Sequence, residues 1–140
     1  MDIEGDVKEL INEFNTANPY RLIKYLDIGL IETMLPAKTW GMTVSSFGAT
    51  TIMVNSFLNM NQQRFTLAHE LGHAIEHPGV STSFLRNYSK GVQIPKIEAE
   101  ANYFAFDLLL YGLNEYGGCF NKYDIVRGLS LSDSMARFIK

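Results

Sequence analysis

The chain of 140 residues is 46% hydrophobic and 19% charged, which is the composition of a globular domain and not of a disordered chain. Its formal net charge of −3, with Lys and Arg scattered singly, disfavours a binding surface for nucleic acid. The single cysteine, Cys119, excludes an intrachain disulfide and a site made of paired thiols. We expect one domain spanning residues 1–140.

The first predicted elements are two helices. In residues 6–17, DVKELINEFNTA, apolar side chains recur at helical spacing. Asn18 and Pro19 then fit the cap and the first turn of a second helix over residues 20–28. The acidic N-terminus lacks the basic start of a signal peptide, and no later stretch reaches the roughly 18 apolar residues that span a membrane. These features favour a cytoplasmic protein that does not bind membranes.

β-branched and aromatic residues, interrupted by Gly and Pro, dominate residues 28–57. Three stretches predict strands: GLIETML (29–35), TWGMTVSSF (39–47) and TTIMVNSFL (50–58). The expected sheet is small, antiparallel and three-stranded, with a tight turn at residues 47–49. A strand between Trp40 and Phe57 could pair with an extended substrate, although an ordinary core sheet explains the same pattern equally well.

The next predicted helix runs through the histidines and ends near His77, because Pro78 and Gly79 stop it. Residues 79–95 show no sustained period and predict a loop. Residues 96–113, KIEAEANYFAFDLLLYGL, are rich in Ala, Leu and Glu and form the clearest helical pattern of the chain.

Two short helices are predicted at the end of the chain, over residues 122–129 and 131–140, with Ser132 or Asp133 as the cap of the second. The order of predicted elements is helices, then a small sheet, then helices. The predicted fold class is therefore α+β.

Residues 65–78, FTLAHELGHAIEHP, contain all three histidines of the chain. His69, Glu70 and His73 form the pattern H-E-x-x-H, which puts two imidazoles one turn apart on one face of a helix. Glu70 lies about 100° around the helix from His69, where it can hold a water molecule and accept its proton. A single histidine is usually just packed or solvated, whereas this spacing favours a catalytic metal site. Gly72 costs a helix about 1 kcal/mol relative to Ala, which indicates that another element passes close by.

A catalytic zinc ion takes three protein ligands and one water molecule. His77 lies one turn further on, but three ligands along one straight helix point too nearly parallel, and a favourable place at a helix C-terminus explains it better. The following helix offers Glu98, with Asn102 one turn below it to hydrogen-bond a ligand. It also offers Glu100, which can instead be a solvated charge or a supporting group. We expect Glu98 to be the third ligand, with Glu100 as the alternative.

The stretch QRFTLAHELGHAIEHP (63–78), followed by KIEAEANYFAFDLLL (96–110), resembles the ImmA/IrrE family of metallopeptidases found in phages and integrative elements. The resemblance covers roughly residues 55–110. It rests on the lead-in before the histidines, the H-E-L-G-H core and the E-x-E-A-N-x-F-A helix, which occur in this order at spacing like that of the family.

The resemblance implies a zincin-like fold and a set of site residues. Zn²⁺ would be held by His69, His73 and Glu98, and Glu70 would be the general base. Arg64 and Asn102 match family positions that support the site without performing the chemistry.

Family members of this kind cleave a repressor protein. The implied function is a zinc endopeptidase that cleaves a repressor or another regulatory protein of a phage or mobile element. The alternative is a non-proteolytic antirepressor that sequesters its partner, which the presence of Glu70 disfavours because a structural site needs no base. The oxyanion stabiliser, the oligomeric state and any activating protein stay open. Four side chains are chemically able to stabilise the oxyanion: Tyr88, Tyr103, Arg86 and His77.

Overall fold

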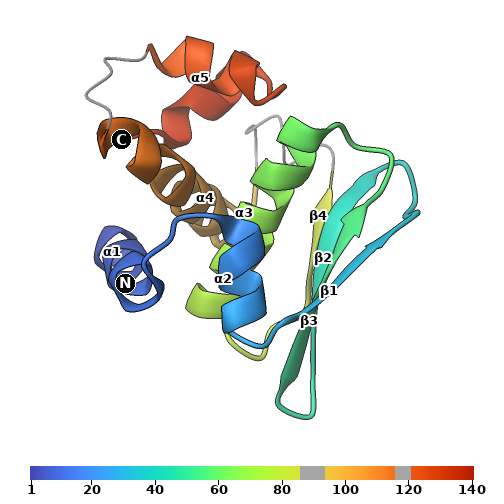
Figure 1. The fold of residues 1–140 in the computed structure, drawn as a ribbon. Helices are drawn as coiled ribbons and strands as arrows, with labels where there is room; N and C mark the ends of the chain where they lie inside the picture. The colour runs from blue at the N-terminus through green and yellow to red at the C-terminus, as the bar shows by residue number, and fades with distance from the viewer. Residues whose placement is uncertain (86–93, 116–120) are drawn as a thin grey trace.

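Helix α3 (Met60–Glu76), which carries the histidines, lies between a sheet on one side and helix α4 (Lys96–Glu115) on the other (Figure 1). The computed structural model describes residues 1–85, 94–115 and 121–140. Arg86, Tyr88 and Cys119 fall outside these ranges. The described residues form an α+β fold, as the sequence predicts.

Both predicted N-terminal helices are present, as α1 (Ile3–Phe14) and α2 (Pro19–Tyr25). Their first turns are closed by side chains, since Asp2 accepts a hydrogen bond from the Gly5 N–H and Asn18 accepts one from the Tyr20 N–H. Helix α1 packs against α4, and α2 packs against α3. Helix α2 also contacts strand β1, whereas α1 lies on the side of the helical layer away from the sheet (Figure 1).

Helix α3 begins with a capping box. The Asn59 side chain accepts a hydrogen bond from the Gln62 N–H, and the Gln62 side chain accepts one from the Asn59 N–H. The helix ends at Glu76, and the N–H of the next residue, His77, donates to the carbonyl oxygen of His73 at 2.8 Å. The predicted helix end near His77 is confirmed.

The sheet has four strands in the order β1-β3-β2-β4, so the predicted three-stranded antiparallel sheet is wrong. The strands are β1 (Gly29–Thr33), β2 (Thr39–Ser46), β3 (Ala49–Asn55) and β4 (Thr82–Leu85). Strands β2 and β3 form the expected antiparallel hairpin, and β4 pairs antiparallel with β2. Strand β1 pairs with β3 and runs parallel to it.

Two features explain the difference. Strand β4 has only four residues and lies in the segment 79–95 that was expected to be a loop, where it is too short to show an alternating pattern. Because β4 occupies one side of β2, strand β1 pairs with β3 at the other end of the sheet. Strands β2 and β3, between Trp40 and Phe57, are thus both internal in the described sheet, flanked by β4 and β1.

All described helices lie on one face of the sheet (Figure 1). Ile52, Val54 and Phe84 point into the layer between sheet and helices and are at most 2% exposed. On the outer face, Ile31 and Val44 are 47% and 36% exposed. The hydrophobic core therefore lies between the sheet and α3 and continues between α3 and α4.

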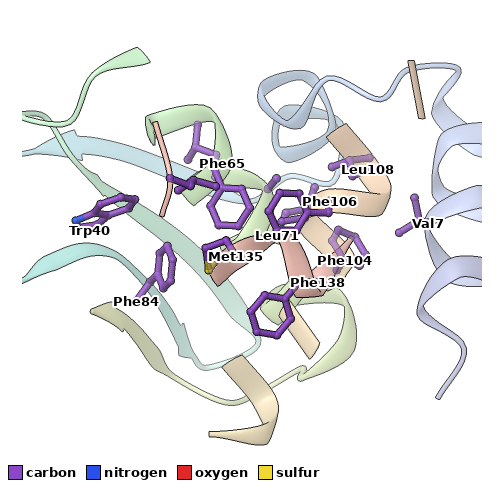
Figure 2. Packing of buried hydrophobic residues seen from close by; sticks show 14 of the residues in the cluster. Val7, Trp40, Phe65, Leu71, Phe84, Phe104, Phe106, Leu108, Met135 and Phe138 are labelled. Carbon is purple, nitrogen blue, oxygen red and sulfur yellow. The ribbon is translucent and has the colours of Figure 1, made fainter. Parts of the chain in front are cut away.

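A cluster of aromatic side chains fills this core around α3 (Figure 2). The rings of Phe65 and Phe106 lie 5.0 Å apart between α3 and α4, and Phe84 of β4 lies 6.2 Å from Phe65. Aromatic packing thus ties the histidine helix to the sheet and to α4 at the same time.

The chain ends in α5 (Lys122–Gly128) and a 3₁₀ helix, η2 (Asp133–Phe138), which confirms the two predicted short helices. Ser132 occupies the cap position of η2, but its side chain makes no capping hydrogen bond. Helix η2 packs against α4, where Phe138 meets the ring of Tyr103 at 5.3 Å. Among the described helices, none is both long and apolar enough to cross a membrane.

At Gly72, helix α4 lies directly against α3. A Cβ atom built on Gly72 would lie 3.0 Å from the Cβ and 3.1 Å from two ring carbons of Phe104. The expectation that another element passes close to Gly72 is confirmed, and that element is the helix that carries Glu98.

We expect Gly72→Ala to lower the free energy of unfolding by about 1–2 kcal/mol, because crowding of Phe104 outweighs the better helix propensity of Ala. Urea unfolding of the metal-free protein measures this. Gly128→Ala is the matched control, since a Cβ there meets nothing within 4 Å. The control should be neutral or slightly stabilising. A Gly72→Ala protein as stable as the wild type would contradict the packing argument.

Candidate metal centre

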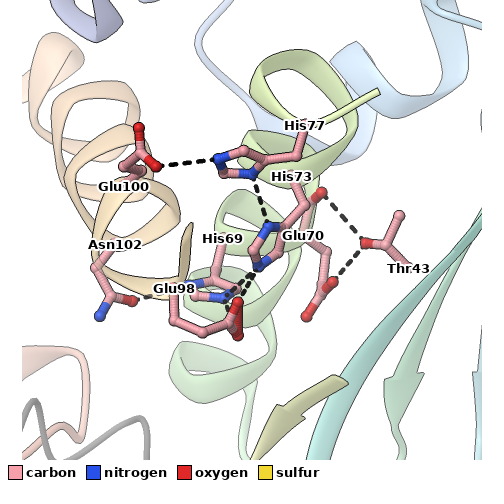
Figure 3. Close-up of polar contacts among 8 residues, drawn as sticks. All are labelled: Thr43, His69, Glu70, His73, His77, Glu98, Glu100 and Asn102. Carbon is pink, nitrogen blue, oxygen red and sulfur yellow. Dashed lines mark hydrogen bonds and ion pairs between the residues drawn. The ribbon is translucent and has the colours of Figure 1, made fainter. Parts of the chain in front are cut away.

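Four titratable side chains from α3 and α4 meet inside the core. His69, Glu70 and His73 are 0% exposed, and Glu98 is 3% exposed. The Nε2 atoms of the two histidines lie 3.2 Å apart. Glu98 reaches both of them, with Oε1 3.4 Å from His69 Nε2 and Oε2 2.6 Å from His73 Nε2 (Figure 3). Within the described part of the chain, His69, His73 and Glu98 form the one group that could hold a metal ion.

The alternative third ligand, Glu100, lies elsewhere. Its Oε1 atom is 3.5 Å from His77 Nε2, on the side of His73 that faces away from Glu98 (Figure 3). Glu98 and Glu100 are two residues apart and therefore project from different sides of α4. The geometry favours Glu98 over Glu100 as a ligand.

Two glycines let the neighbouring elements reach this site. At Gly72 the close contact with Phe104 brings α4 onto α3, one residue before His73. At Gly41 of β2, a Cβ would lie 2.6 Å from a methyl carbon of Thr66 and 3.4 Å from the Cγ of Glu70. Small residues at both contacts therefore hold a strand and a helix close to the histidine motif.

The donor atoms fit a metal ion. The Asn102 side-chain oxygen Oδ1 accepts a hydrogen bond from Nδ1 of His69 at 2.8 Å. The lone pair of the neutral His69 ring is therefore on Nε2. That lone pair faces His73 Nε2 and the Glu98 carboxylate, so a proton or a cation must lie between these atoms. Two ligands of a tetrahedral zinc ion, each about 2.0–2.1 Å from it, lie about 3.3 Å apart. The 3.2 Å separation of the two Nε2 atoms and the 3.4 Å separation of His69 Nε2 from Glu98 Oε1 match this value, whereas the 2.6 Å contact of His73 Nε2 with Glu98 Oε2 is shorter.

The charges also favour a cation. Burial raises the pKa of Glu98, but hydrogen bonds with His69 and His73 outweigh burial and lower that pKa to about 2. Burial lowers the pKa of His73 more than the neighbouring Glu98 raises it. A carboxylate binds metal in its anionic form and an imidazole binds metal in its neutral form, and these shifts favour the two forms for Glu98 and His73.

Glu70 is oriented by Thr43 of β2. The Thr43 hydroxyl donates a short hydrogen bond to Glu70 Oε2, while Oε1 is buried and has no hydrogen-bond partner among the described residues (Figure 3). Burial raises the pKa of Glu70 well above its ordinary value, the Thr43 hydrogen bond lowers it, and the charge of Glu98 raises it. A buried acceptor without a partner is costly, which makes Oε1 the atom available to a water molecule or a substrate.

The sequence did not reveal two residues that shape the site. Thr43 carries no local signal, because its role depends on how β2 packs against α3. Phe84 stacks on the His69 ring, with centroids 3.9 Å apart and planes at 19°, but it lies in the segment that was expected to be a loop. Only the three-dimensional pairing of β4 with β2 brings Phe84 to the histidine.

The structure separates the other candidates from this cluster. Arg64 is exposed and lines a cavity of about 280 Å³ with residues of α4 and α5, and among the described residues it makes no hydrogen bond or ion pair with the cluster. Tyr103 packs against Phe138 and lies 5.2 Å from the Lys140 ammonium group. Arg86 and Tyr88 fall outside the described residues.

Comparison with known proteins agrees with this geometry. The sequence profile of the peptidase M78 family, described as the IrrE N-terminal-like domain, matches residues 24–111, which is more than half of the chain. The chain belongs to this family. The resemblance to the ImmA/IrrE metallopeptidases is thereby confirmed.

Two curated relatives come from Bacillus and one of its phages. Uncharacterized immunity region protein 2 of Bacillus phage phi105 is 37% identical over 108 residues, which make up 77% of this chain and 68% of that protein. Metallopeptidase ImmA of Bacillus subtilis (strain 168) is 28% identical over 108 residues, which make up 77% of this chain and 63% of that protein.

Metal content tests the choice of the third ligand. We expect one zinc per wild-type chain, loss of most of it in Glu98→Ala, and retention of one zinc in Glu100→Ala at saturating metal. Elemental analysis after dialysis measures the amount bound, and circular dichroism shows that each variant is folded. Loss of zinc with Glu100→Ala but not with Glu98→Ala would reverse the assignment.

Proposed function

We propose that the protein is a zinc-dependent endopeptidase in which His69, His73 and Glu98 hold the metal and Glu70 is the general base. The observation that carries the proposal is the buried cluster of two imidazoles and a carboxylate beside a second carboxylate, Glu70, whose Oε1 is free. Membership in the peptidase M78 family and the similarity to metallopeptidase ImmA support it. A purely structural metal site would have no use for Glu70.

Each residue has a distinct part in the proposed reaction. Zinc in such a site polarises a carbonyl group and lowers the pKa of water to about 7. Glu70 accepts the proton of the attacking water on Oε1 and later gives it to the leaving amine. Thr43 holds Glu70 Oε2, so the carboxylate keeps one orientation in both steps. Asn102 fixes the ring of His69 by accepting its Nδ1 proton.

The proposed substrate is a transcriptional repressor or another regulatory protein of a phage or mobile element. Two observations support this: the family resemblance, and the relative of phage phi105 that is named as an immunity region protein. A repressor acts on DNA in the cytoplasm, which is where we propose that cleavage takes place. The competing proposal is that the chain relieves repression by binding the repressor without cutting it.

Glu70→Gln distinguishes the two proposals. Because Gln cannot accept the proton, we expect the cleavage rate of a candidate repressor to fall by about 10²–10⁴, while zinc content and repressor binding stay as in the wild type. Mass spectrometry of the incubated repressor measures cleavage, and a pull-down assay measures binding. If Glu70→Gln relieved repression in cells as fully as the wild type, the binding mechanism would replace the enzymatic one.

Thr43→Val tests how Glu70 is oriented. Loss of a buried hydrogen bond to a carboxylate, about 1.5–3 kcal/mol, should lower kcat by about tenfold to a hundredfold with zinc still bound. Thr43→Ser keeps the hydroxyl and serves as the control, for which we expect nearly wild-type kcat. Equal rates for Thr43→Val and the wild type would show that Glu70 does not depend on this contact.

A further inference from the structure

The third histidine of the motif helix, His77, contacts the back of the second one. Nδ1 of His77 lies 2.9 Å from Nδ1 of His73, and the two ring centroids are 5.0 Å apart (Figure 3). His77 is the residue that caps α3, and it is only 9% exposed. On its far side, Nε2 faces Oε1 of Glu100 at 3.5 Å. A chain of polar groups therefore runs from Glu100 through His77 to His73 and ends at the proposed metal site.

A contact between two imidazole nitrogens at 2.9 Å holds one proton, because two protons or two lone pairs would repel each other. If His77 carried that proton in a neutral ring, its Nε2 lone pair would face the Glu100 carboxylate, acceptor against acceptor. If His73 carries it, His77 Nε2 bears a proton that points at Glu100. The second arrangement makes the Nδ1 contact a hydrogen bond and turns the Nε2 proton towards the Glu100 carboxylate, which lies 3.5 Å away without a hydrogen bond.

The same arrangement prepares His73 for a metal. With the proton on Nδ1, the lone pair of His73 lies on Nε2, which faces His69 and Glu98. His69 is prepared in the same way by Asn102. Histidines that bind metal commonly donate their second N–H to a carbonyl or carboxylate, and here one of the two donates to another histidine.

We propose that His77, held by Glu100, is a positioning residue that fixes the proton of His73 on Nδ1 and keeps Nε2 free for the metal. The inference rests on the metal site of the proposed function. It gives His77 a role other than ligand, because its Nδ1 contacts His73 and its Nε2 faces Glu100 on the side away from the proposed metal site. It also explains the position of Glu100, two residues from Glu98 on α4 but directed at a different histidine.

Zinc affinity is the first test, measured by competition with a chromophoric chelator at pH 8. We expect His77→Phe, which fills the same space without an acceptor, to bind zinc about 10–100-fold more weakly. His77→Gln, which retains an acceptor, should recover much of this loss, and Glu100→Gln should cause a smaller one. Glu9→Gln is the control for the loss of one negative charge, since Glu9 is an exposed side chain on α1. Its zinc affinity should be unchanged.

The second test locates the proton by NMR in the wild-type protein. It therefore requires neither enzymatic activity nor a folded variant. In zinc-loaded protein with ¹⁵N-labelled histidine, a coupling across the hydrogen bond should link His73 Nδ1 and His77 Nδ1. The proton should be assigned to His73, and His77 should carry its own proton on Nε2. A proton on His77 Nδ1, or no coupling between the rings, would overturn the inference.

The outcomes separate this inference from the proposed function. Wild-type zinc affinity in a folded His77→Phe protein would refute the role of His77 and leave the peptidase proposal standing. Absence of zinc from the wild-type protein would refute the metal site on which both rest. Weak zinc binding in His77→Phe, together with the coupling in the wild type, would support the inference even for a chain that cleaves no repressor.

Discussion

The structure depends on keeping two imidazoles and two carboxylates inside a hydrophobic core. Buried charges without partners are strongly unfavourable, so each of these groups must have a partner in the protein or an ion. The Glu98 carboxylate lies close to the Nε2 atoms of both histidines. Asn102 contacts the Nδ1 atom of His69, and His77 contacts that of His73. Thr43 donates a hydrogen bond to one carboxylate oxygen of Glu70. At the centre, His69 Nε2, His73 Nε2 and the Glu98 carboxylate converge. A divalent cation placed there would complete the set.

This requirement accounts for much of the surrounding architecture. Helix α4 must lie close enough to α3 for a glutamate side chain to reach both histidines, and the Gly72–Phe104 contact allows that approach. On the other side, Gly41 lets β2 come close to Glu70, so that Thr43 reaches its carboxylate. Strand β4 adds Phe84, whose ring covers His69. Each neighbouring element therefore contributes one contact to the same cluster.

The sequence predicted the parts of the molecule that depend on local signals. Helix α3 was predicted from the H-E-x-x-H spacing and its Pro78-Gly79 stop. Glu98 as the third ligand, inferred from its place one turn before Asn102, stays a prediction, and the structure places this side chain against both histidines. The pairing of β1 with β3 and the existence of β4 were not predicted, because strand order depends on contacts between distant segments. Thr43 and Phe84 were missed for the same reason. The contact between His77 and His73 follows from side-chain orientation, which helical spacing alone does not determine.

Packing restricts which residues can occupy the two x positions of the H-E-x-x-H pattern. Leu71 is 0% exposed in the core, and Gly72 touches Phe104. All five residues from His69 to His73 are buried, so each of them is constrained by packing as well as by chemistry. A designer who grafts this pentapeptide onto another helix would obtain the ligands without their environment. The transferable unit is the pair of helices together with the strand that supplies Thr43.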